Sequence, residues 1–360
     1  FAGMTGGAAA LSAAERQAML PLTLRRLENF LLNPVKDHFR ERLGVVFQPL
    51  DLAVADDEPF DLNALDETLL LRELLESPAD EAPTTIAACR ADLQVRTERL
   101  VRRGELPVGG IGQRWRAEFV QQSAPMALQW NAWRRELSEP AKPRQVTAEL
   151  DGLTLDDWLD ELRQAPGSDR PVWLTLDARR LCRFDKKSQT LQPLAYKLVR
   201  PWLRLLVAGA CGIDLEARIV ARDALLVLAA PRRAVAQVVL DDLLDVWEQG
   251  MLRPLAVACR TALAWLAARE QFPDQPDKAD EAARTCYEGG HTSRGEVQDA
   301  ALARLFPDWD TLAADPAFAS WAERLYEPLR AWAADEHGVT VLPLPDAHPG
   351  ADEDDEDARH

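Results

Sequence analysis

The chain has 360 residues, a hydrophobic content of 47% and a formal net charge of −17 at pH 7. This composition predicts a globular protein of one to three domains and excludes an intrinsically disordered chain. The excess of acidic residues argues against a surface that lies on DNA throughout, because a phosphate backbone attracts positive charge. The longest apolar stretch, residues 205–213, is far shorter than the roughly 20 residues that cross a bilayer, so we expect no membrane contact.

Five cysteines lie far apart in the sequence, and no two of them have the spacing of a C-x-x-C motif. Their odd number favours a reducing cytoplasm over a disulfide framework, and the histidines complete no ligand pair for a structural zinc. The chain begins at Phe1, and the nearest methionines are Met4 and Met19. We therefore expect a fragment of a longer protein, without a signal peptide, since no positively charged start precedes an apolar run.

Residues 23–45 predict two helices that meet at Asn33 and Pro34. Asn33 suits an N-cap, Pro34 suits the first helical position, and Gly44 can end the second helix. Apolar residues recur at three- and four-residue steps, which predicts one buried stripe: Leu24, Leu27, Leu31, Val35, Phe39 and Leu43. Residues 45–47 then read as a short strand.

Further helices are predicted near residues 61–75, 87–103 and 113–134. The glycine-rich stretch 104–112 separates the last two, and we interpret it as a connector because no Gly-Lys-Ser/Thr follows it. Between residues 96 and 116 only two glutamates oppose six arginines: Arg96, Arg99, Arg102, Arg103, Arg114 and Arg116. These arginines could contact DNA or an acidic partner, or could form the solvated face of two helices.

From Arg144 onward the pattern becomes that of strands. Apolar and polar residues alternate over residues 145–150 and 153–162, on either side of Asp151 and Gly152, which predict a hairpin turn, and a third strand is expected over residues 171–176. Helices then alternate with strands: helix 194–208, strands 216–222 and 225–229, helices 235–249, 255–269, 298–306 and 318–334, and strand 339–342. Strands grouped between helical blocks predict an α/β (α+β) fold with one central sheet.

Four short blocks carry a resemblance to a known family. Residues 23–45 resemble the first helices of the nuclease-like domains of bacterial recombination helicase–nucleases, with a leucine, an aromatic and a small residue before Pro34. Residues 57–65 narrow the match to the C-terminal domain of the exonuclease V gamma subunit family, the RecC family. Two more blocks are similar to that family: residues 243–255, with Trp247 and Gly250, and residues 286–296, with Tyr287 and Gly295.

The resemblance implies a restriction-endonuclease-like core of the PD-(D/E)XK type, catalytically degenerate, with a large helical portion. It implies a noncatalytic role in double-strand break repair and recombination: docking a RecB-like beta subunit and a RecD-like alpha subunit, and shaping the DNA path. This domain would bind no cofactor, since ATP and Mg²⁺ would be used by the partner subunits. Residues 1–143 would form a helical portion packing on the core, residues 144–345 the core with C-terminal helices, and residues 346–360 a disordered acidic tail.

Active nucleases of this type place an acid after the second strand and an Asp/Glu-x-Lys motif after the third. The two carboxylates hold Mg²⁺ between the phosphate and the attacking water, and the lysine orients or deprotonates that water. Here Asp160 takes the first position and Asp177 the second, with Arg179 in place of lysine. Arginine cannot replace lysine in this role, because its pKa stays above about 12.

The one literal Asp-x-Lys motif consists of Asp185 and Lys187, in a polar stretch that reads as a loop. Whether Asp177 or Asp185 corresponds to the nuclease motif stays open. We expect vestigial acids and no catalysis by this domain alone. Two alternatives remain, an active Mg²⁺-dependent nuclease that uses Asp160, Asp185 and Lys187, and a stand-alone DNA-binding module.

Overall fold

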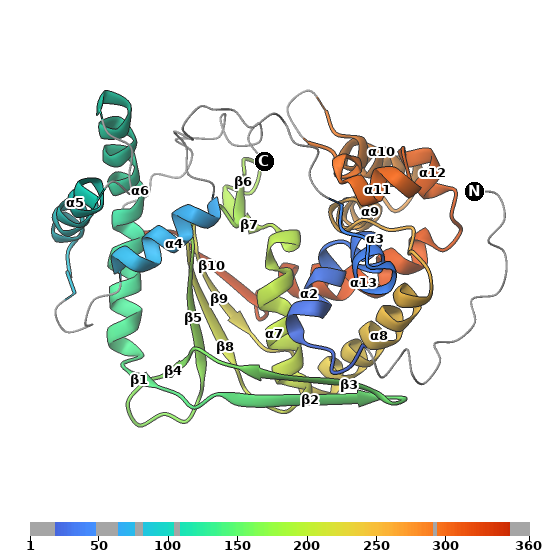
Figure 1. Cartoon of the computed structure of the whole chain (residues 1–360), viewed down its shortest axis with the longest axis horizontal. Coiled ribbons are helices and arrows are strands. Elements are labelled where there is room, and N and C mark those ends of the chain that lie inside the picture. The colour runs from blue at the N-terminus through green and yellow to red at the C-terminus, as the bar shows by residue number, and fades with distance from the viewer. Residues whose placement is uncertain (1–18, 48–63, 76–81, 104–108, 291–293, 346–360) are drawn as a thin grey trace.

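A mixed β-sheet lies at the centre of the computed structural model and carries helices on both faces (Figure 1). The structure describes residues 19–47, 64–75, 82–103, 109–290 and 294–345. Within them the sheet has six strands in the order β1-β4-β5-β8-β9-β10. Their bounds are β1 Glu139–Pro140, β4 Leu162–Gln164, β5 Val172–Asp177, β8 Glu216–Ala221, β9 Leu225–Ala229 and β10 Val339–Leu342. The predicted mixed α/β class is confirmed.

The hairpin predicted at Asp151 and Gly152 joins β2 (Arg144–Leu150) to β3 (Leu153–Leu159). Both turn residues have positive φ, 47° and 81°, as a two-residue hairpin turn requires. The second strand was expected to continue to residue 162, but it stops at Leu159 and resumes as β4. Glu161, with φ of 56°, lies at this break. The break lets the chain leave the hairpin and join the central sheet beside β5.

Strands β5 and β8 form a parallel pair, from Val172 opposite Glu216 to Asp177 opposite Ala221. Parallel neighbours need a crossover connection, and here it contains α7 (Val199–Ala210) after a 3₁₀ turn, η2 (Ala195–Leu198). The first five residues of β5 are buried, as in a strand covered on both faces. Asp177 is therefore the first half-exposed residue at the carboxyl end of a buried strand.

The predicted break between two N-terminal helices is confirmed at Asn33. Helix α2 covers Leu24–Leu32, and α3 (Pro34–Asp37) continues into a π-helical turn, η1 (His38–Arg42). The Asn33 side chain accepts a hydrogen bond from the backbone N–H of Lys36 at 2.9 Å. The strand expected at residues 45–47 is wrong, since none forms there. Instead the Val45 N–H closes the helix end by donating to the Phe39 carbonyl.

One hydrophobic cluster joins α2 to β2, β3, α7 and the C-terminal helices α8 (Arg233–Leu252), α9 (Cys259–Gln271) and α13 (Phe318–Ala334). On the other side of the sheet, a second cluster holds α4 (Ala64–Leu75), α5 (Ile86–Arg103) and α6 (Gly109–Glu136). Helix α6 already begins at Gly109, so the connector expected over residues 104–112 is wrong for its last four positions. Residues 104–108 lie outside the described ranges.

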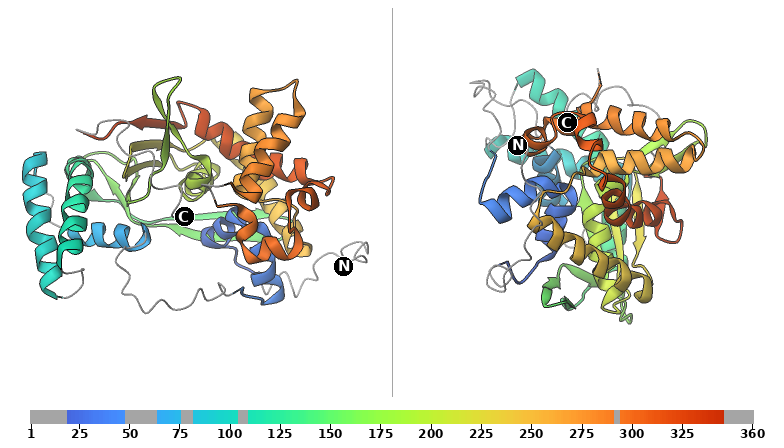
Figure 2. Two further views of the ribbon diagram at one scale, coloured as in Figure 1. Left: turned by 90° about the horizontal axis from the view of Figure 1, so that it is seen from above. Right: turned by 90° about the vertical axis from the view of Figure 1, so that its right-hand side faces the viewer.

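Several helices and strands were not predicted from the sequence. They are the hairpin of β6 (Cys182–Asp185) and β7 (Thr190–Pro193), and the helices α10 (Pro276–Glu288) and α12 (Trp309–Ala313). Helix α11 (Ala300–Leu305) falls inside the predicted helix 298–306. Figure 2 shows α5 and α6 at one end of the molecule, the C-terminal helices at the other, and the β6–β7 hairpin projecting between them. The family-like residues 57–63 and the acidic tail lie outside the described residues.

Candidate functional site at the carboxyl end of strand β5

The Asp177 carboxylate is bound by the guanidinium of Arg179, two residues further along the chain. Arg179 Nη2 lies 2.7 Å from Asp177 Oδ2, and Arg179 Nε lies 3.0 Å from Oδ1. The Arg179 backbone N–H also donates to Oδ1 at 3.0 Å. This hydrogen bonding raises the pKa of Arg179, so its proton is held firmly. Both carboxylate oxygens of Asp177 thus accept hydrogen bonds from Arg179.

Asp160, just beyond β3, is paired with an arginine as well. Arg204 on α7 donates from Nη2 to Asp160 Oδ1 at 3.3 Å and to the Asp160 carbonyl at 3.0 Å. Only 9% of Arg204 is exposed, and its guanidinium lies 4.5 Å from the centre of the Trp173 ring. Burial lowers the pKa of Arg204, although the Asp160 contact opposes that effect. The cation is therefore a fixed part of the core, held between an indole ring and the end of β3.

A third carboxylate, Glu28 on α2, was missed by the sequence analysis. It follows Leu27 of the apolar stripe and sits where α2 contacts α7, with Oε2 4.0 Å from Arg200 Nε. Burial raises the pKa of Glu28, while the positive charges of Arg200, Arg179, Arg25 and Arg204 oppose the rise. Glu28 thereby links the arginine partners of Asp160 and Asp177. We call Glu28, Asp160, Asp177, Arg179, Arg200 and Arg204 the arginine–carboxylate cluster.

The alternative motif lies apart from this cluster in secondary structure. Asp185 ends β6, in a two-stranded sheet separate from the one that holds Asp177. It accepts hydrogen bonds from the Lys187 backbone N–H at 2.9 Å, from Ser188 Oγ at 2.9 Å and from Gln192 Nε2 at 3.0 Å. The hydrogen bonds from the Lys187 N–H, the larger cause, and from Ser188 Oγ lower the pKa of Asp185. Asp185 is therefore the residue that organises the β6–β7 turn, and the loop expected over residues 185–192 is in fact a hairpin.

Metal-ligating side chains do not gather in the described part of the chain. No three His, Cys, Asp or Glu residues among the described residues are placed so that they could hold one metal ion. The five cysteines are free thiols. In the same residues, no helix is long and apolar enough to span a bilayer.

The six arginines of the α5–α6 region divide into two groups. Arg96 donates to the Leu74 carbonyl at 2.7 Å and Arg116 to the Gly112 carbonyl at 3.1 Å, so these two side chains stabilise helix ends and turns. The other four are exposed and cluster near the loop end of the helix pair: Arg99, Arg102, Arg103 and Arg114. Positive charge at the C-terminal turn of α5 is also favourable for the helix itself. Arg102 and Arg103, which lie in that last turn, therefore have a local stabilising role beside any role in binding.

The family-like blocks pack against one another rather than forming a site. The ring of Phe30 on α2 lies so close to Gly250 that a Cβ there would be 2.4 Å from Phe30 Cε2. His38 Nδ1 is hydrogen-bonded to the Gly250 carbonyl at 2.7 Å. Glu296 accepts hydrogen bonds from the backbone N–H groups of Arg260 and Thr261, and so caps α9. These blocks attach the N-terminal helices to the C-terminal ones.

Two comparisons with known proteins agree with this architecture. The family model of the RecC C-terminal domain matches residues 20–270, a range that contains the whole arginine–carboxylate cluster. The chain is also 27% identical over 300 residues to the RecBCD enzyme subunit RecC of Escherichia coli (strain K12), an alignment that covers 79% of this chain. That alignment spans 23% of the length of the relative. The chain belongs to the RecC C-terminal domain family.

Proposed function

We propose that this domain is a noncatalytic, nuclease-like part of a RecBCD-type complex that acts in DNA double-strand break repair and recombination. Its partners would be a RecB-like beta subunit, a RecD-like alpha subunit and the DNA that passes between them. The order of a hairpin, strand β5, helix α7 and a parallel strand β8 supports a core of the PD-(D/E)XK type. Free, scattered cysteines favour the reducing cytoplasm as its location.

The pairing of Asp160 and Asp177 with arginines is the observation that carries the noncatalytic assignment. Metal-dependent hydrolysis needs carboxylates open to Mg²⁺ and a base or orienting group for the attacking water. In this domain guanidinium donors contact both carboxylates, and arginine keeps its proton at any physiological pH. The core then serves as a scaffold, while ATP and Mg²⁺ would be used by the partner subunits and none by this domain.

Incubation of the chain with end-labelled linear DNA and Mg²⁺ or Mn²⁺ tests this assignment. We expect the wild-type chain to cleave no more DNA than the Asp160→Ala variant does. Cleavage that disappears in Asp160→Ala or Asp185→Ala would contradict the proposal and support the active nuclease that uses Asp160, Asp185 and Lys187. A pull-down with separately purified beta and alpha subunits tests the docking role, and we expect both to be retained.

A further inference from the structure

Three exposed arginines near the loop end of the α5–α6 pair lack an acidic partner within the described residues. They are Arg99 and Arg102 on α5 and Arg114 on α6. Their neighbour Arg103 has only a distant one, with Nη1 4.0 Å from Glu73 Oε1. These four arginines form a local positive surface on a chain whose net charge is −17. We call them the α5–α6 arginine surface.

The chain leaves its last strand on the side of the sheet that carries this surface. Strand β10 runs toward the side where α4 and α6 lie (Figure 1). Two residues beyond β10, Leu344 is buried in the hydrophobic cluster of α4, α5 and α6. The same cluster contains Leu100, which lies between Arg99 and Arg102 on α5. Whatever follows Leu344 in the sequence therefore starts near the α5–α6 pair.

The residues that follow are strongly acidic. Residues 346–360 contain seven acids and one arginine, and residues 352–357 are six acids in succession. An extended chain advances by at most about 3.5 Å per residue, so the first acid of this run reaches up to about 28 Å from Leu344. Helix α4, which contacts both β5 and α5, has 12 residues and is about 18 Å long. The acidic run can therefore span the distance from the sheet to α5.

We propose that residues 352–357 bind the α5–α6 arginine surface of the same molecule and so exclude other polyanions from it. A guanidinium and a carboxylate form charge-assisted hydrogen bonds. One such pair at an exposed surface contributes less than about 1 kcal/mol, but several pairs on one short tether act together. The tether holds the acids at an effective concentration in the millimolar range, against which an external polyanion must compete.

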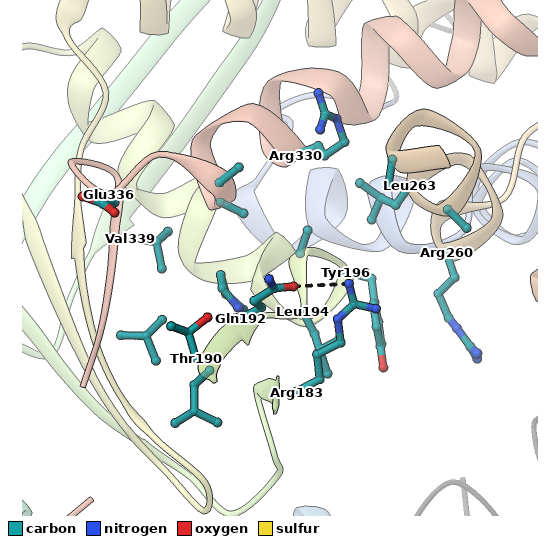
Figure 3. A pocket seen from close by; sticks show the side chains of 18 of the residues that line it. Arg183, Thr190, Gln192, Leu194, Tyr196, Arg260, Leu263, Arg330, Glu336 and Val339 are labelled. Carbon is teal, nitrogen blue, oxygen red and sulfur yellow. Dashed lines mark hydrogen bonds between the residues drawn. The ribbon is translucent and has the colours of Figure 1, made fainter. Parts of the chain in front are cut away.

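The second positive surface of the molecule fits the acidic run less well. It is the groove of about 950 Å³ that Arg183 and Arg260 line (Figure 3). Most of its other walls are apolar, and Glu336 adds a negative charge to them. Residues 352–357 have no apolar side chain that could gain from contact with such walls. Charge alone therefore favours the α5–α6 arginine surface.

The inference does not depend on the proposed function. The charges, the position of Leu344 and the reach of the acidic run are properties of this chain. The family model matches residues 20–270, a range that leaves out residues 346–360.

Carbodiimide cross-linking of the whole 360-residue chain tests where the acids lie. The reagent couples a lysine amine to a carboxylate in contact with it and does not couple arginine. In Arg102→Lys we expect mass spectrometry of the monomer to recover a link from residue 102 to residues 352–357. Arg144→Lys, at an exposed position of β2, is the control and should give no such link. Absence of the link at residue 102, links mainly to Lys186 or Lys187, or links found only in covalent dimers would each overturn the proposal.

Competition with a labelled polyanion tests the consequence. The probe is a fluorescent peptide with the sequence of residues 346–360, and its anisotropy is measured at low salt. An amide variant, with every acid of residues 352–357 changed to Asn or Gln, should bind the probe at least fivefold more tightly than the wild type. At 1 M salt the gain should disappear, because the Debye length is then about 3 Å.

The same gain, measured in two other backgrounds, locates the effect. It should vanish when Arg99→Ala and Arg102→Ala are present, and persist when Arg183→Ala and Lys187→Ala are present. A gain that persists without Arg99 and Arg102 would contradict the proposal. Equal affinity of the wild type and the amide variant would also contradict it, and would mean that the surface is open to a different acidic partner.

Discussion

Asp177 and Arg179 form a two-point ion pair across a single intervening residue, with Arg179 Nη2 2.7 Å from Asp177 Oδ2. The pair sits at the end of the buried strand β5, and Asp177 retains only 17% side-chain exposure. Because the guanidinium fork matches the carboxylate geometry, this contact is stronger than a single-point pair with lysine would be. The positive charge of Arg179 also lowers the pKa of Glu28, so one arginine balances the negative charge of two acids.

Replacing this arginine alone should not create a nuclease. In Arg179→Lys the fork on Asp177 is lost and a lysine stands in the motif position, but Arg204 still holds Asp160. We therefore expect no cleavage of labelled linear DNA in Mg²⁺ or Mn²⁺, by gel assay over hours. Arg204→Met removes the donor to Asp160 and keeps an apolar side chain over Trp173, so the double variant of Arg179→Lys and Arg204→Met frees both acids. Cleavage by Arg179→Lys alone would show that a single substitution had disabled the site, and that the other pairings are irrelevant.

The buried carboxyl of Asp37 should make stability depend on pH. Asp37 is 2% exposed, its Oδ2 has no hydrogen-bond partner, and burial raises its pKa to about 7 although Arg40 contacts it. A raised pKa in the folded state means that the acid favours folding while protonated and opposes it once ionised. The stability contribution is thus full below about pH 4 and is lost as the pH rises through about 7. Asp37→Asn should be more stable than the wild type at pH 8, by at most ~4 kcal/mol, and the difference should shrink toward pH 4.

Thermal or urea unfolding at several pH values measures this effect. Asp169→Asn is the matched control, since Asp169 is exposed and the same change of charge there should alter stability little at any pH. A difference between Asp37→Asn and the wild type that is constant from pH 4 to pH 8 would show that the Asp37 carboxyl does not titrate in this range.

Caps and turns, which depend on a few adjacent residues, were predicted correctly from the sequence. Asn33 before Pro34 placed the break between α2 and α3, and Asp151 with Gly152 placed the β2–β3 turn, because each depends on a few adjacent residues. Asp160 and Asp177 were chosen because they lie at predicted strand ends, where the nucleases that the sequence resembles place their acids. That each of these acids is paired with an arginine is known only from the structure.

Glu28 could not be found in this way, because its neighbours Arg179 and Arg200 come from segments more than 150 residues away and meet it only when α2 packs on α7. The β6–β7 hairpin was missed because each strand is only four residues long, although apolar and polar residues alternate in both. Helix α10 was missed because its apolar stripe is weak: six of its 13 residues are charged, and only Ala279, Ala283 and Tyr287 are buried.

The close contact between Phe30 and Gly250 should make even a methyl group costly. A Cβ on residue 250 would lie 2.4 Å from Phe30 Cε2 and 2.8 Å from Cζ, so Gly250→Ala must displace a fully buried ring. Overpacking of this kind typically destabilises by about 1–3 kcal/mol. Gly110→Ala is the control, because a Cβ there meets no atom within 4 Å and lies in a helix, where alanine is favourable.

Chemical denaturation of Gly250→Ala, of Phe30→Leu and of the variant with both changes completes the cycle, with Gly110→Ala as the control. We expect the double variant to lose less stability than the two single losses combined, since the smaller side chain makes room for the methyl group. Additive losses would mean that the two residues do not compete for the same space.

The cap that Glu296 provides for α9 should be among the most sensitive polar contacts of the C-terminal helices. Its two oxygens accept hydrogen bonds from the backbone N–H groups of Arg260 and Thr261 and from Thr261 Oγ1, at 2.6 to 3.0 Å. Glu296→Ala would leave these donors without an acceptor, and a buried donor left unsatisfied costs about 1–3 kcal/mol. Glu296→Gln keeps one acceptor oxygen and should fall between the alanine variant and the wild type.

Unfolding by urea ranks these variants against Glu98→Ala, a control at an exposed position of α5 that should change stability by less than about 0.5 kcal/mol. Glu296→Ala should also weaken the packing between the N-terminal and C-terminal helices. Helix α9 packs on α13, and the Tyr326 hydroxyl of α13 donates a hydrogen bond to the Leu31 carbonyl at 2.9 Å. Hydrogen exchange should therefore rise at α9 and at the end of α2, and stay unchanged in α5 and α6. Exchange that rises uniformly over the whole chain would indicate global destabilisation, and would count against a cap that acts through this path.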